Sequence, residues 1–434
     1  MNGRLALLAA ALAFSALSSS AQTPPALVVD SPNFRPVPIA VADFLADGED
    51  VPAAAEVTAA VRGDLALSGF FQVLDPKSFL ADPGEGLSAA TVKFARWADV
   101  GADGLARARV RRVGADLTAE LVLFEVRAGR EAQRTALHAP ISEPRGLGHR
   151  IADAIVTYYT REPGMFSSRI ASVRRGGGTW DIVVLDVDGR NPRVVLSEKN
   201  ILMTPAWKPD GSEILVTSWR SGHPEIWSLR LSDRAFRRAV PVTNAMGGVW
   251  SPDGRRIAFT ATEGANSDVW VVNADGSTPR KITHEPALDL SPSWSPDGKR
   301  LAFVSDRAGT PQIYIVDAEG NGSPRRLTFQ GNYNQTPQWS PRGDLLAFTG
   351  RDERKVFDVF VATVDGGKIT RITQDQGRTN EEPSWSPNGR LMVFKTDRGG
   401  TPALVISDPR GDRQTVVGTG QGELTAPVWG PVTR

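Results

Sequence analysis

Few side chains in this sequence are spaced as a catalytic or metal-binding site requires. The four histidines are scattered and show none of the short spacings typical of zinc sites. They are His138, His149, His223 and His284. The chain has no cysteine, so it has neither thiolate chemistry nor disulfides. The Gly-x-Ser-x-Gly pentapeptide of α/β-hydrolase nucleophiles is also missing. We therefore expect no enzyme activity, no cofactor and no metal.

One acidic stretch and one histidine deserve a structural interpretation. The stretch Asp186-Val187-Asp188-Gly189 faintly resembles a calcium loop, but the later oxygen ligands of an EF-hand loop are missing. We interpret it as a turn. His149 lies in a predicted helix, where a single histidine is more often structural than a ligand.

The residues that do recur at a regular spacing are tryptophans followed by turn residues. Successive copies lie about 44 residues apart, the spacing of β-propeller blades. The tryptophans are Trp207, Trp250, Trp294, Trp339, Trp385 and Trp429. In the sequence Pro-Asp-Gly that follows three of them, proline presets φ and glycine allows a positive φ. The tryptophans are expected to fill the space between blades, and a ligand-stacking role is the alternative.

Each repeat contains four short strands separated by turn signals. In the Trp294 repeat, 300–304, 312–316 and 326–328 follow the strand that ends at the tryptophan. The first unit lacks a leading tryptophan, and the Trp429 copy has a leading strand with nothing after it. The C-terminal strand should therefore complete the first unit and close a ring of six blades, which removes exposed sheet edges.

The region before the repeats predicts a small α/β domain. A strand is expected over 37–42, a helix over 54–67 and a pair of strands over 105–112 and 116–126. Apolar residues at helical spacing from Leu147 to Tyr158 predict a second long helix. Because Pro163 ends that helix, the domain boundary is placed beside it.

The first residues have the pattern of a secretory signal peptide. Arg4 precedes an apolar run from Leu5 to Leu17, too short to span a membrane, and Ser19-Ser20-Ala21 offers a cleavage site. The predicted organisation is a signal peptide over 1–21, an extended segment over 22–33, an α/β domain over 34–163 and an all-β six-bladed β-propeller over 164–434. The net charge of +1 gives no electrostatic case for nucleic-acid binding.

The whole chain resembles the TolB family, the periplasmic components of the Tol-Pal system. The resemblance rests on FRPVPIAVADF at 34–44, on LGHRIADAIV at 147–156, and on the six-fold repeat. It implies a monomeric periplasmic binding protein without transmembrane segments after signal removal. It further implies binding to the lipoprotein Pal and to TolA, a role in outer-membrane integrity and invagination during division, and use by some bacteriocins.

The resemblance also implies where the partners bind. Pal is expected at one end of the propeller, around its channel, on segments just before the inner strands. The implied residues are Asn244, Met246, Gly247, Leu290, Ser291, Tyr333, Asn334, Gln335, Thr336, Asn380, Glu381 and Glu382. Asn244 stands near the place where some relatives carry a histidine that contacts Pal. The TolA segment is expected to use Ala26, Leu27, Val28, Val29 and Asp30, which can add as a strand to a partner's sheet.

Two other classes of function remain as alternatives. A propeller-bearing serine peptidase would need a nucleophile elbow and a hydrolase domain, for which the sequence offers no sign. A generic periplasmic propeller would bind a glycan or peptide in its channel and would not bind Pal.

Overall fold

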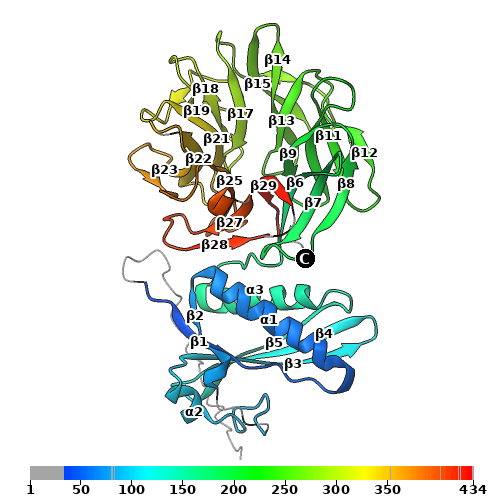
Figure 1. Cartoon of the computed structure of the whole chain (residues 1–434), viewed down its shortest axis with the longest axis vertical. Coiled ribbons are helices and arrows are strands. Elements are labelled where there is room, and N and C mark those ends of the chain that lie inside the picture. The colour runs from blue at the N-terminus through cyan, green and yellow to red at the C-terminus, as the bar shows by residue number, and fades with distance from the viewer. Residues whose placement is uncertain are drawn as a thin grey trace, which may run out of the picture.

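The protein is described by a computed structural model that covers residues 34–79, 82, 84–351, 353–400, 402–418, 420 and 422–432. An α/β domain lies beside a β-propeller (Figure 1). The predicted signal peptide and the predicted TolA segment, residues 1–33, lie outside the described residues.

A five-stranded sheet forms the centre of the α/β domain, in the order β2-β1-β3-β4-β5. Its strands are β1 (Val37–Val41), β2 (Phe71–Val73), β3 (Gly104–Val113), β4 (Asp116–Glu125) and β5 (Arg130–Pro140). The inner strand β1 is parallel to β2 and β3, whereas β3, β4 and β5 form an antiparallel meander. Both β2 and β5 were missed by the sequence analysis.

The two long helices are α1 (Val51–Ser68) and α3 (Pro144–Thr160), and they pack against each other. The apolar stripe predicted from Leu147 onward is buried against α1 and the sheet. Gly148 allows this close contact, because a Cβ there would lie 2.6 Å from the Cβ of Ala60. A short helix, α2 (Phe94–Asp99), belongs to a separate core with Trp97 and Phe124. Three 3-10 turns complete the elements: η1 (Gly48–Asp50), η2 (Pro76–Ser78) and η3 (Arg398–Gly400).

The propeller has six four-stranded antiparallel sheets, as the repeat predicts. Blade 1 is β9 (Leu202–Trp207), β10 (Glu213–Ser218), β11 (Glu225–Arg230) and β12 (Phe236–Arg238); blade 2 is β13 (Ala245–Trp250), β14 (Arg256–Glu263), β15 (Asn266–Asn273) and β16 (Arg280–Lys281); blade 3 is β17 (Asp289–Trp294), β18 (Arg300–Ser305), β19 (Gln312–Asp317) and β20 (Arg325–Arg326). Blade 4 is β21 (Tyr333–Trp339), β22 (Leu345–Arg351), β23 (Phe357–Thr363) and β24 (Ile369–Arg371); blade 5 is β25 (Asn380–Trp385), β26 (Met392–Thr396), β27 (Ala403–Ser407) and β28 (Gln414–Val417).

Blade 6 confirms the predicted closure of the ring. The C-terminal strand β29 (Glu423–Trp429) pairs with β6 (Arg169–Gly176), which continues into β7 (Thr179–Asp186) and β8 (Arg193–Glu198). The two chain ends of the propeller thus share one sheet, and the ring has no open edge at this point.

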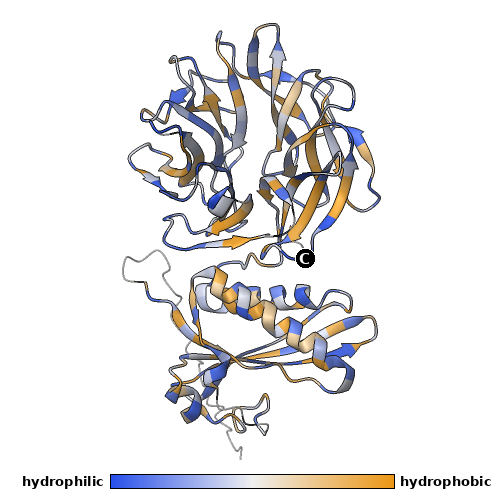
Figure 2. Ribbon diagram, viewed as in Figure 1, coloured by the Kyte–Doolittle hydropathy of each residue, from blue (hydrophilic) through white to orange (hydrophobic). Residues whose placement is uncertain are grey.

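The repeated tryptophans lie between blades, as expected. Five of the repeated tryptophans are almost fully buried in cores that join neighbouring sheets, whereas Trp207 is half-buried; the five are Trp250, Trp294, Trp339, Trp385 and Trp429. The indole of Trp385 donates a hydrogen bond across the blade boundary to the carbonyl of Gln338 at 2.9 Å, and that of Trp294 donates to Val249 at 3.2 Å. Hydrophobic residues run along the blade strands and along the helix faces (Figure 2). These contacts support the inter-blade interpretation over a ligand-stacking role.

Candidate functional site

The two ends of the propeller differ in what they contact. The end that carries the Trp-Ser-Pro-Asp-Gly turns meets the α/β domain. There Glu162 contacts Arg342 and Arg390, and Asn388 donates a hydrogen bond to the carbonyl of Pro163 at 3.0 Å. The inner strands begin at the other end, which we call the open end. The open end is therefore the candidate surface for a partner.

The six inner strands, each contacting the next, form a ring at the open end. In every blade the pairing of the inner strand with its neighbour shifts register near its start. The residue at the shift has a left-handed backbone; these residues are Thr204, Gly247, Ser291, Thr336, Glu382 and Ala426. Five of the six precede a proline, a signal in the sequence that marks the bulge.

Hydrogen bonds link these bulges from blade to blade. The backbone N–H groups of Gly247, Ser291 and Glu382 each donate to a threonine hydroxyl of the preceding blade, at 3.0 to 3.1 Å. At the boundary of blades 5 and 6, the N–H of Ala426 donates instead to the carboxylate of Glu382 at 2.7 Å. Such bonds thus join the bulges at four blade boundaries, and Glu382 takes part in two of them.

The structure places the sequence-predicted residues close to the expected position, with two corrections. Except for Asn244, they lie within the first residues of β13, β17, β21 and β25 instead of in loops before them. Asn334 and Asn380 were expected to be exposed, but both are buried. Asn334 donates to the side chain of Gln312, and Asn380 donates to Asp358, so each amide is used in a hydrogen bond to the preceding blade.

The remaining predicted residues are accessible to a partner. Asn244 is exposed, and Met246, Leu290, Tyr333, Gln335 and Glu381 are half-buried. The ring of Tyr333 packs edge-on against that of Phe357, with 6.1 Å between the ring centres. The guanidinium carbon of Arg351 lies 4.8 Å from the centre of the Tyr333 ring. The tyrosine is therefore held in place.

One carboxylate at the open end has a perturbed acidity. Burial raises the pKa of Glu381, and Lys395, 3.9 Å away, opposes that shift. The neighbouring amide of Gln335 donates a hydrogen bond to Glu381 at 3.4 Å. These partly desolvated polar groups can contribute more to binding than fully hydrated ones.

Two exposed apolar residues were missed as site candidates. Phe329 is 70 % exposed and Leu288 is 42 % exposed. Both follow the fourth strand of a blade and precede the next inner strand, so they belong to the open end. The signal in the sequence is an apolar residue after the last strand of a repeat, where a solvated loop would carry a polar one.

A cavity of about 640 Å³ lies beside this group in blade 4. Asn332, Arg351 and Glu353 line it together with Phe348 and Phe360. A polar rim around an aromatic floor is typical of a pocket that receives one side chain of a partner protein.

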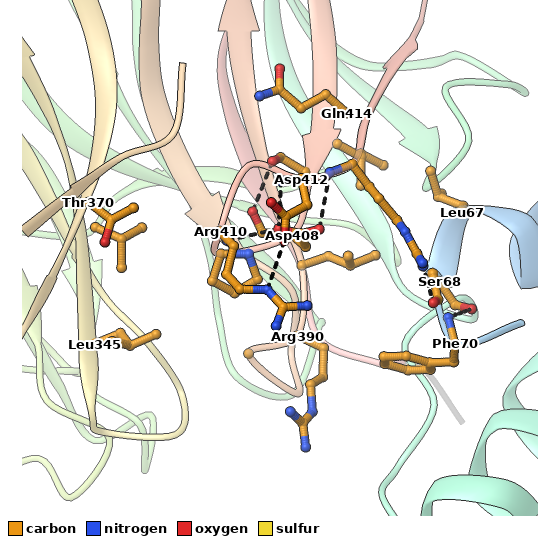
Figure 3. Close-up of a pocket in the computed structure, with 18 of the residues that line it drawn as sticks. Leu67, Ser68, Phe70, Leu345, Thr370, Arg390, Asp408, Arg410, Asp412 and Gln414 are labelled. Carbon is orange, nitrogen blue, oxygen red and sulfur yellow. Dashed lines mark hydrogen bonds and ion pairs between the residues drawn. The ribbon is translucent and has the colours of Figure 1, made fainter. Parts of the chain in front are cut away.

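A cavity of about 960 Å³ lies between the two domains. Figure 3 shows Phe70 and Ser68 of the α/β domain across from the turn that carries Asp408, Arg410 and Asp412. Phe34, the first described residue, also lines this cavity. None of the predicted Pal-facing residues lines it, so the two regions are separate surfaces.

Comparison with known proteins identifies the fold and the order of the domains. A TolB beta propeller domain matches residues 157–433, and a TolB amino-terminal domain matches residues 25–132. The chain belongs to the TolB family. A Tol-Pal system protein TolB from Anaeromyxobacter dehalogenans is 64 % identical over 433 residues and covers 100 % of both chains.

More distant TolB relatives agree with this assignment. A Tol-Pal system protein TolB from Myxococcus xanthus is 46 % identical over 201 residues, which is 46 % of each chain. The crystal structure of TolB from Acinetobacter baumannii has a TM-score of 0.80 and 28 % identity, and the match covers 92 % of this chain and 97 % of that one. Within the part of the chain that the structure describes, no helix of this TolB-family protein is long and apolar enough to cross a membrane.

Proposed function

We propose that this protein is a non-enzymatic periplasmic component of the Tol-Pal system that binds Pal through the open end of its propeller. The observation that carries the proposal is the group of accessible apolar side chains there, Leu288, Phe329 and Tyr333. Amide and carboxylate groups such as Gln335 and Glu381 lie beside them. Apolar anchors within a polar rim are the usual anatomy of a protein–protein interface.

The second part of the proposal concerns TolA. The segment before Phe34 contains Ala26, Leu27, Val28 and Val29, an apolar run of the kind that adds as a strand to a partner's sheet edge. Family membership and the signal-peptide pattern support cleavage after Ala21 and export to the periplasm. Binding Pal and TolA together would support outer-membrane integrity and invagination during division, and bacteriocins would compete for the open end.

The proposal is tested by titrating the mature chain, beginning at Gln22, with the lipid-free domain of Pal from the same organism. Phe329→Ala and Tyr333→Ala should each weaken binding by at least ~1 kcal/mol, about fivefold in Kd, because both truncate accessible aromatic anchors. The matched control is Val194→Ala, which truncates a comparably accessible residue on the outer strand β8 and should leave Kd unchanged.

Two further results decide between the parts of the proposal. A chain beginning at Phe34 should bind Pal normally and lose TolA binding. If its TolA affinity is unchanged, the N-terminal part is wrong while the Pal part stands. If Val194→Ala weakens Pal binding and the two aromatic variants do not, the partner surface has been assigned to the wrong part of the propeller.

A further inference from the structure

A second group of polar side chains gathers where the α/β domain meets the propeller. His149 comes from α3 and Asp64 from α1. Asp186 ends β7 of blade 6, and Asp188 lies in the turn that follows it. His149, Asp64 and Asp186 are buried, and Asp188 is half-buried. Spacing in the sequence could not reveal this group, since His149 and Asp64 are 85 residues apart.

The orientation of the His149 ring is that of a metal ligand. Its Nδ1 lies 2.6 Å from the Asp64 carboxylate, which fixes the ring. Its Nε2 is buried without a hydrogen-bond partner and points toward Asp186, whose Oδ2 lies 3.5 Å away. A carboxylate on one ring nitrogen, with the other nitrogen left free, is the arrangement that usually supports a histidine bound to a metal.

The separation of the donor atoms also fits a small cation. One atom each from His149, Asp186 and Asp188 lies within 4.8 Å of the other two. Zinc bonds of about 2.0 Å to nitrogen and oxygen place tetrahedral ligands roughly 3.3 Å apart. The distance of 3.5 Å between Nε2 of His149 and Oδ2 of Asp186 is close to this ligand-to-ligand separation. Asp188 supplies the third ligand atom from the turn after β7.

The charges around the site leave room for a divalent ion. Four carboxylates act on one another or on His149: Asp64, Asp153, Asp186 and Asp188. Three guanidinium groups oppose them, since Arg145 and Arg190 pair with Asp188 and Arg169 acts on Asp186. With a neutral imidazole the group therefore carries one negative charge in excess, four against three.

Solvent can reach the site. A cavity of about 540 Å³ is lined by His149 and Asp186 together with Arg145, Arg169 and Asn191. Asn191 donates to Asp186 Oδ2 at 2.7 Å, which orients that carboxylate. The cavity gives a path for an ion and space for water in the remaining coordination position.

We propose that His149, Asp186 and Asp188 bind a first-row divalent cation, with zinc the best match to one imidazole and two carboxylates, and that Asp64 positions His149. The ion would connect α3 of the α/β domain to blade 6 of the propeller. It would therefore stabilise the contact between the domains, in addition to the existing ion pair of Arg145 with Asp188.

Cobalt(II) is the probe for this site, because its visible absorption reports coordination directly. The full mature chain, stripped with a chelator, should bind one equivalent of cobalt(II), and zinc should displace it. Zinc should also raise the melting temperature. Asp188→Asn, which changes a half-buried turn residue, should remove the absorption while the chain stays folded. Asp64→Asn should weaken binding about 10- to 100-fold, the usual effect of losing a positioning partner.

The matched control is His223→Ala. His223 lies 3.3 Å from Glu225 in a similar histidine–carboxylate pair, but it is 41 % exposed and belongs to no such group. This variant should bind cobalt(II) as the parent does. The proposal is overturned if the parent chain binds no cobalt(II) at millimolar concentration, or if Asp188→Asn and His149→Gln bind it as tightly as the parent.

Discussion

At the scale of single residues, the contact between Glu162 and Arg390 gives the interface between the domains a pH dependence. The carboxylate accepts a hydrogen bond from Nε of Arg390 at 2.7 Å, and this bond holds the pKa of Glu162 below its ordinary value of 4.5. Because the pKa of Glu162 is lower in the folded protein than in the unfolded chain, the contact stabilises the fold at pH values above the unfolded-state pKa. That stabilisation is lost as the pH falls through the folded-state pKa.

Glu162→Gln should therefore destabilise the protein by about 1–3 kcal/mol at pH 7, because the nearly buried guanidinium of Arg390 loses its charged partner. Thermal unfolding should show a lower Tm at pH 7 and a difference that shrinks below about pH 4. Asp43→Asn is the control, since Asp43 pairs with Arg62 but is 89 % exposed. An equal loss of Tm in both variants at every pH would contradict this account.

At the scale of elements, the ring depends on its last strand. Trp429 in β29 is 6 % exposed, and its indole donates to the hydroxyl of Ser168 at 2.7 Å. Deleting 422–434 removes this tryptophan, whose loss alone costs about 3–5 kcal/mol, and exposes the edge of β6. We expect the truncated chain to aggregate on size-exclusion chromatography. A deletion of 433–434 alone keeps β29 and should elute as the parent does. If the longer deletion melts like the parent, the shared blade does not stabilise the ring.

The elements that the sequence predicted are those with a local signal. A tryptophan followed two residues later by a proline marks the end of each inner strand, so six blades and their closure could be inferred from spacing. Strand β5 was missed because it lies at the sheet edge, where its residues from Arg130 onward are mostly half-buried or exposed and carry no run of apolar side chains. The burial of Asn334 and Asn380 was missed because it depends on partners from other strands, Gln312 and Asp358. The group around His149 was missed for the same reason.

At the scale of the whole molecule, the two ends of the propeller have different roles. Turns of blades 4, 5 and 6 contact the α/β domain through side chains such as Arg342, Asn388 and Asp188. At the opposite end of the propeller, the open end exposes Leu288 just before blade 3 and Phe329 just before blade 4. The propeller therefore uses one end to contact the α/β domain and leaves the open end for a partner.

The most direct test of this assignment is amide hydrogen exchange of the mature chain with and without saturating Pal. We predict slower exchange in 285–291 and 328–336, which form the open end, and unchanged exchange in the turns at 252–254 and 275–277. Slower exchange in those turns, with none at 328–336, would contradict the central claim that the open end binds Pal.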